Sequence, residues 1–341
     1  MVRRGVLLLL VLTAAACGAG DFDPQSTLKT VRILGARADK PYAKPGEDVE
    51  VEVLAFDGRV AKTAPMKVSW IPFVCENPVN DLYYACFATL AGGAGPPSAA
   101  NPGAGAIAAL LKPGVDLTPL LPSGPKYRFT MPADAVRAHP PSPGATAPYG
   151  LTVLFNVACA GHVEITERDP KNPVSPPLGC FDDAGHQLGP DDYAIGFQRV
   201  YAYDQRTNQN PVIARVLADG TPVDPRDGLT VPHCTAEKKE DCTKVKLDVD
   251  VPPDSAEANE GDVDPSGTVR HELVWASWFT TLGELAKNDN ELLYEPRAGR
   301  ITSDNEAELR PPPVTGEGTM FAVVHDNRGG AAWVEFPLHV R

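Results

Sequence analysis

The sequence lacks the features that would assign a protein to a class directly. Its N-terminal apolar run, Val6–Leu12, is far shorter than the roughly 20 residues of a membrane-spanning helix. It has no G-x-S-x-G, P-loop, G-x-G-x-x-G or H-E-x-x-H motif, so no hydrolase, nucleotide-binding or zinc-protease signature is present. Long helices and a doubly wound α/β fold are disfavoured, because 35 of the 341 residues are proline, roughly twice the average usage.

The N-terminal residues have the pattern of an export signal. Two arginines precede the apolar run and small residues follow it, so residues 1–16 are predicted to be a signal peptide. A cysteine directly after them resembles the lipobox of bacterial lipoproteins, although Ala14 stands where leucine is usual. The resemblance implies that Cys17 is acylated, that residues 17–27 are a tether, and that the protein is lipid-anchored in the cell envelope, at the outer membrane. The alternative is ordinary cleavage, which leaves a soluble exported protein with a free Cys17.

The balance of charges is strongly acidic. The formal net charge is −13, and no cluster of basic residues with interleaved aromatics occurs. Such a surface repels phosphates and anionic headgroups. Nucleic acid is therefore not an expected partner, and contact with the membrane is expected through the lipid.

Six cysteines follow Cys17, and their order along the chain favours short-range pairs. The predicted disulfides are Cys75–Cys86, Cys159–Cys180 and Cys234–Cys242. Other pairings remain open, as does metal ligation, although none of the spacings matches the C-x₂₋₄-C pattern of zinc sites. Disulfides are the usual state of cysteine pairs in an exported protein.

Segments with alternating apolar residues recur after residue 28 in two sets. The first set is 48–56, 67–74, 126–131, 150–158 and 193–203, and the second is 211–218, 244–251, 271–280, 318–325 and 331–340. A period of two predicts antiparallel strands with one face buried.

The two sets look like copies of one unit. Val68-Ser69-Trp70 matches Ala276-Ser277-Trp278, and residues 326–330 (DNRGG) read as a closing hairpin loop. A mid-strand tryptophan followed by such a hairpin resembles immunoglobulin-like sandwiches. The predicted fold is all-β, with two tandem immunoglobulin-like β-sandwich domains at 28–204 and 205–341 and long disulfide-bearing loops.

Two short segments carry a further resemblance. With the lipobox and the tandem sandwiches, residues 208–213 (NQNPVI) and 325–330 (HDNRGG) make the chain similar to lipoproteins of high-GC Gram-negative bacteria. That resemblance implies architecture and no activity.

One acidic segment is a calcium candidate. Asp262, Asp264 and Ser266 resemble the start of an EF-hand loop, where alternate oxygens converge on a hard cation. The match ends at Leu273, where a bidentate glutamate is needed. The alternative is a solvated loop, and no other cofactor is expected.

The tryptophans divide into core and contact candidates. Trp70 and Trp278 are predicted to fill the two sandwich cores. Trp333 lies on the face of its strand opposite to that of Val334 and Phe336, so it is predicted to be partly exposed and is a candidate binding residue.

Three functional hypotheses remain. The first is a non-catalytic envelope lipoprotein that binds or scaffolds an envelope protein or glycan, with no catalytic residues. The second is a carbohydrate-active or other hydrolase with its site in the insertions at 75–122 and 159–190. The third is a calcium-stabilised adhesion module.

Overall fold

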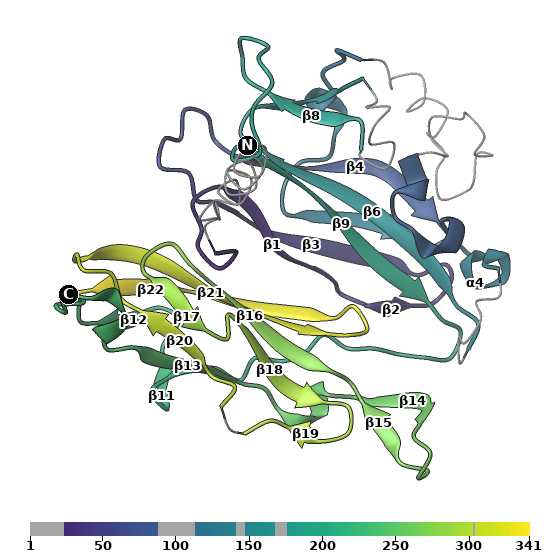
Figure 1. Cartoon of the computed structure of the whole chain (residues 1–341). Helices are drawn as coiled ribbons and strands as arrows, with labels where there is room; N and C mark the ends of the chain where they lie inside the picture. The colour runs from purple at the N-terminus through teal and green to yellow at the C-terminus, as the bar shows by residue number, and fades with distance from the viewer. Residues whose placement is uncertain (1–23, 88–112, 141–146, 168–175, 303) are drawn as a thin grey trace, which may run out of the picture.

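The computed structural model describes residues 24–87, 113–140, 147–167, 176–302 and 304–341, without the side chains of 259–262. The described part of the fold is built of strands, and the helical elements whose bounds are described are single turns (Figure 1). These turns are η1 (Val79–Asp81), η2 (Thr118–Leu120), α4 (Ala135–Ala138), η3 (Lys239–Asp241) and η4 (Pro253–Ser255). Within the ranges given, no helix is both long and apolar enough to span a bilayer.

Strands β1 to β6 and β9 form the two sheets of the first domain. One sheet has the order β1 (Val31–Ala38), β3 (Asp48–Asp57), β5 (Lys126–Thr130). The other has the order β2 (Tyr42–Ala43), β9 (Tyr193–Ala202), β6 (Gly150–Cys159), β4 (Lys67–Glu76). Strand β2 runs parallel to β9, and all the other pairs are antiparallel.

The core between these sheets follows from the alternation in the sequence. Val49, Val51 and Val53 point inward from β3, while Glu50 and Glu52 remain partly exposed. The valines share a cluster with Trp70 of β4, which is fully buried as predicted and whose Nε1 donates to the Gly124 carbonyl at 3.0 Å. Burial of this indole with its polar atom satisfied explains why the mid-strand tryptophan stabilises the sandwich.

A third layer covers the outer face of the first domain. All ten residues of β6 are buried, so apolar side chains lie on both of its faces. The outer face packs on the insertions, which contribute β7 (His162–Ile165), β8 (Leu178–Phe181) and the buried side chain of Leu117. The predicted insertion at 75–122 is therefore not a plain surface loop over 113–122, because Leu117 packs in this cluster; residues 88–112 lie outside the described part of the chain.

Strands β10 to β22 form the second domain. One sheet has the order β11 (Thr221–Val223), β10 (Arg215–Ala218), β13 (Val245–Asp250), β20 (Ala307–Arg310), β17 (Glu284–Lys287). The other has the order β12 (Leu229–Val231), β22 (Ala331–Val340), β21 (Gly316–Asp326), β16 (Val274–Thr280), β18 (Asn290–Glu295), β19 (Gly299–Arg300). A separate hairpin, β14 (Ala258–Val263) and β15 (Val269–His271), extends from this body (Figure 1).

The two domains share one strand order. Each has a central antiparallel pair of strands (β6 with β9, β21 with β22). Beside it lies a strand that carries a buried tryptophan (β4, β16), and a short strand runs parallel to the last strand (β2, β12). Trp278 on β16 is fully buried, as Trp70 is on β4. Two packed antiparallel sheets with this order are immunoglobulin-like sandwiches, so the predicted all-β tandem fold is confirmed.

The domains lie side by side and share apolar contacts (Figure 1). Leu28 and Leu34 of the first domain pack with Phe321 and Val323 of the second. At Gly35 the backbone of β1 lies so close to the second domain that a Cβ would be 3.0 Å from Cγ1 of the Val323 side chain. A side chain there would push the two domains apart.

Candidate functional site

The six cysteines form the three predicted disulfides. Their Cα–Cα distances are 5.7 Å for Cys75–Cys86, 5.8 Å for Cys159–Cys180 and 5.3 Å for Cys234–Cys242. The first attaches its insertion to β4 and the second attaches its insertion to β6, and both belong to the cluster on the outer face of β6. Cys17 lies outside the described residues, so its acylation stays a prediction.

The calcium candidate forms a turn in the described residues. The Oδ1 atom of Asp264 accepts hydrogen bonds from the backbone of Ser266 (2.8 Å) and Thr268 (3.0 Å) at the tip of the β14–β15 hairpin. The side chain of Asp262 lies outside the described side chains. Among those described, no group of three or more His, Cys, Asp or Glu forms a metal site. The calcium hypothesis stays a prediction, and Asp264 has a structural role.

Trp333 is half-buried at the boundary between the domains. The guanidinium of Arg37 on β1 lies 4.0 Å from the centroid of its ring, and Leu34 lies in the cluster against which the indole packs. The contact that Trp333 makes in the structure is therefore with the first domain of the same chain. Its role toward an external partner stays a prediction.

The candidate functional site is a hollow at the junction of the two domains. Its volume is about 380 Å³, and it is lined by residues from the first domain, from the linker between β9 and β10 (residues 203–214) and from the second domain. They are Tyr42, Arg206, Thr207, Pro253, Asp254, Ala256, Glu257, Ala258, His271 and Arg328. Ligand sites occur preferentially where domains meet. The lining carries both signs of charge and the ring of Tyr42, which suits a polar ligand.

Arg328, at the tip of the β21–β22 hairpin, organises this hollow. Its Nε lies 2.9 Å from Oε1 of Glu272, and its terminal nitrogens donate to the carbonyls of Thr207 (2.6 Å) and Ala258 (3.4 Å). The guanidinium also lies 4.9 Å from the ring centroid of Tyr42. One side chain thus connects the first domain, the linker and the second domain.

The hairpin that carries Arg328 is held by Asp326. Its Oδ1 accepts from the backbone of Arg328 (2.7 Å) and Gly330 (2.8 Å), and its Oδ2 accepts from Nδ2 of Asn208 at 3.3 Å. A Cβ on Gly330 would overlap the Asp326 carboxylate, so only glycine fits there.

The linker is tied to the same place through Asn210. Its Oδ1 accepts from the backbone of Ala331 at 2.9 Å, and its Nδ2 donates to the carbonyl of Ala38 at 2.7 Å. The segments 208–213 and 325–330, noted in the sequence for their resemblance to lipoproteins, therefore meet in the structure. No local pattern indicates that contact, because the two segments are more than 100 positions apart.

The carboxyl groups of Glu257, Glu272 and Asp326 lie around the guanidinium of Arg328. Glu272 has no exposed surface, and Asp326 is 4% exposed. Burial, with added repulsion from Asp326 and Glu257, raises the pKa of Glu272 to about 8, although Arg328 opposes the shift. Burial likewise raises the pKa of Asp326. This cluster at the domain junction, called the joint below, therefore retains a proton at neutral pH.

A second buried carboxyl lies away from the hollow, within the second domain. Glu291 on β18 accepts from Nε1 of Trp278 at 2.9 Å, and burial with a contribution from Asp248 raises its pKa to about 9. With no exposed surface, Glu291 is a core group that satisfies the buried indole. Sequence reasoning missed it, because only the three-dimensional pairing of β16 and β18 places it there.

No protein family model matches the chain, and no curated protein matches it. Among solved structures, it is similar over 92% of its length to the tandem Ig repeats of Dlar, of which 98% is covered at 9% identity and a TM-score of 0.22. It is also similar to PorU from Porphyromonas gingivalis, with 12% identity, 92% of this chain and 24% of that one covered, and a TM-score of 0.22. A bacterial ice-binding adhesin gives 8% identity, 92% and 66% coverage, and a TM-score of 0.19. The assignment of the fold rests on the strand order.

Proposed function

We propose that this protein is an exported lipoprotein of the cell envelope, anchored through Cys17, that binds another envelope component without catalysing a reaction. The observation that carries the binding role is the hollow of about 380 Å³ at the domain junction, with polar side chains from both domains and the linker. The export signal and the lipobox resemblance support the anchoring, and the three disulfides fit an oxidising compartment. The outer membrane is the proposed location.

The fixed arrangement of the joint supports a role in recognition. Arg328, Asp326 and Asn210 hold the domains and the linker in one arrangement, and a pre-organised surface loses little entropy on binding. The mixed charges of Arg206, Asp254 and the neighbouring lining residues suit a partner that presents hydrogen-bonding groups, such as an envelope protein or a glycan.

Site-specific crosslinking in cells tests this proposal. A photo-reactive residue replaces Thr207, an exposed residue that lines the hollow, and in a matched control it replaces Thr221, an exposed residue on the edge strand β11. We expect one discrete adduct at position 207 and none at position 221. Identical adducts at both positions, or none at position 207, would count against a binding site at the junction.

A further inference from the structure

The described chain enters the fold beside the end of β16. The backbone of Leu28 donates to the carbonyl of Thr280 at 2.8 Å, and Thr280 donates to the carbonyl of Ser26 at 2.8 Å. Leu28 is 2% exposed, so this entry point is fixed. Seven positions separate Cys17 from Pro24, where the described chain starts, and they span at most about 24 Å when fully extended. A lipid on Cys17 would therefore hold this end of the molecule close to the bilayer.

The loop between β3 and β4 lies directly beside the entry point. The backbone of Gly58 donates to the carbonyl of Thr30 at 3.0 Å. A Cβ on Gly58 would lie 2.8 Å from the backbone of Leu28, so no side chain fits between the loop and the incoming chain. The loop and the tether therefore emerge from the same end of the first domain.

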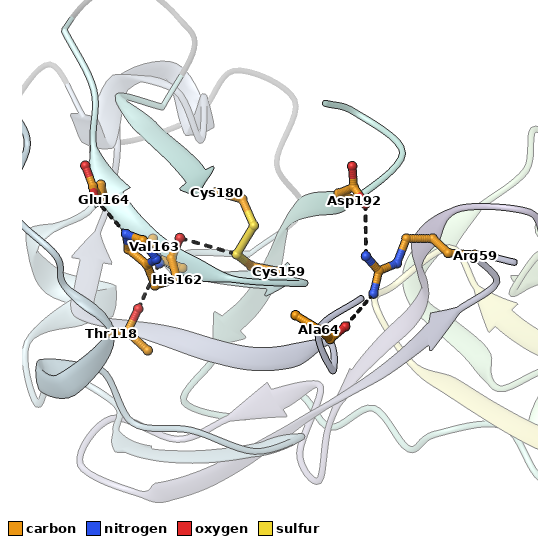
Figure 2. Close-up of a disulfide and its surroundings, with 9 residues drawn as sticks. All are labelled: Arg59, Ala64, Thr118, Cys159, His162, Val163, Glu164, Cys180 and Asp192. Carbon is orange, nitrogen blue, oxygen red and sulfur yellow. Dashed lines mark hydrogen bonds and ion pairs between the residues drawn. A yellow bond between two sulfur atoms is a disulfide. The ribbon is translucent and has the colours of Figure 1, made fainter. Parts of the chain in front are cut away.

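Arg59 gives this loop a fixed shape (Figure 2). Its guanidinium lies 2.9 Å from a carboxylate oxygen of Asp57 and 2.9 Å from one of Asp192, and it donates to the carbonyl of Ala64 at 2.8 Å. The side chain is only 7% exposed. A buried, multiply bonded guanidinium holds the two ends of the loop together and directs its tip outward.

The tip of the loop is apolar and basic. Val60 is fully exposed. Residues 58–67 (GRVAKTAPMK) contain three cations and no acid, in a chain whose net charge is −13. Asp57 and Asp192 more than balance the charge of Arg59, so the positive charge of the loop is that of the exposed Lys62 and Lys67. An exposed apolar residue can enter the headgroup region of a bilayer, and each lysine near an anionic surface adds electrostatic attraction.

We propose that residues 58–67 lie against the headgroups of an anionic bilayer beside the lipid anchor. This inference rests on the proposed acylation of Cys17, and it adds a protein contact to the lipid contact expected from the sequence. Strand β16 runs from the tether to the hollow, so its length gives the distance between them. Thr280 lies at the tether, while Val274 pairs with Asp326 at the junction, about 20 Å away for strand residues at roughly 3.3 Å each. The hollow therefore lies about 20 Å from the anchored end of the molecule.

A depth measurement on the acylated full chain tests the inference. Val60→Cys and Val269→Cys each add one thiol at an exposed valine, and Val269 lies on the hairpin beside the hollow, as the matched control. Each variant is labelled with a fluorophore and incorporated into vesicles of phosphatidylethanolamine and phosphatidylglycerol that carry a headgroup nitroxide quencher. We expect several-fold stronger quenching at position 60 than at position 269. Replacing Lys62 and Lys67 by glutamate in the Val60→Cys background should lower the quenching to the level of the control.

The outcomes separate this inference from the proposed function. A chain whose intact mass shows no acyl groups overturns the anchoring, and with it the loop contact. An acylated chain that is quenched equally at the two positions overturns the loop contact alone. Quenching at position 60 that survives the double lysine substitution overturns the role of charge in the contact.

Discussion

Replacing Glu272 by glutamine should make the stability of the second domain less dependent on pH. The carboxyl is completely buried, and its pKa is raised to about 8 in the folded protein, mainly by burial. In the unfolded chain the same group titrates near its ordinary value of about 4.3. Between these values the native state keeps the proton that the unfolded state has lost, so stability falls as pH rises through this window.

The magnitude follows from the size of the pKa shift. The free energy of unfolding of the wild-type protein falls by about 1.3 kcal/mol between pH 6 and pH 7, by about 1 kcal/mol between pH 7 and pH 8, and by about 0.3 kcal/mol between pH 8 and pH 9. Glutamine carries no titrating proton, so this component should be absent from the variant. The gap between the two stability curves should therefore change by about 3 kcal/mol in favour of the variant from pH 6 to pH 9.

Urea unfolding followed by tryptophan fluorescence at several pH values measures this gap. Glu257→Gln is the matched control, because Glu257 lies 3.7 Å from the same guanidinium of Arg328 but is 22% exposed. Parallel curves for wild type and Glu272→Gln between pH 6 and pH 9 would refute the reasoning. They would mean that Glu272 is already ionised in the folded joint at pH 6.

Three further changes test the packing and the joint. Removing the indole donor with Trp278→Phe should lower stability by about 1–3 kcal/mol in calorimetry, since Glu291 would lose its buried partner; an unchanged melting temperature would contradict this role. Replacing Cys159 and Cys180 by serine should cost about 3 kcal/mol, as expected for a loop of 21 residues, and intact stability would show that the outer layer needs no disulfide. Asp326→Ala should expose the linker to limited proteolysis several-fold faster, while equal rates would show that the hairpin does not hold the joint.

Most of the strands could be predicted because their signals are local. The alternation of Val245, Leu247 and Val249 depends only on a pleated strand with one buried face, and all three are buried on β13. The three disulfides could be predicted for a similar reason, since each closes a short loop between neighbouring strand segments.

The outer layer and the joint could not be predicted, because they depend on contacts between distant residues. The alternation rule assigned one buried face to residues 150–158, but both faces of β6 are buried, because the insertions fold back over it. The hydrogen bond from Asn208 to Asp326 joins residues 118 positions apart and has no local signature. Trp333 was correctly expected to be partly exposed within its own sandwich, but the pattern of one strand does not show that Arg37 covers its ring.

Intact mass and thiol titration test the proposed anchoring most directly, on protein extracted from the membrane fraction of cells that express the full chain. We predict a mature chain that begins at Cys17, carries acyl groups there, has six cysteines in three disulfides and shows no free thiol. An unacylated chain recovered in the soluble fraction, or a free thiol at Cys17, would contradict it.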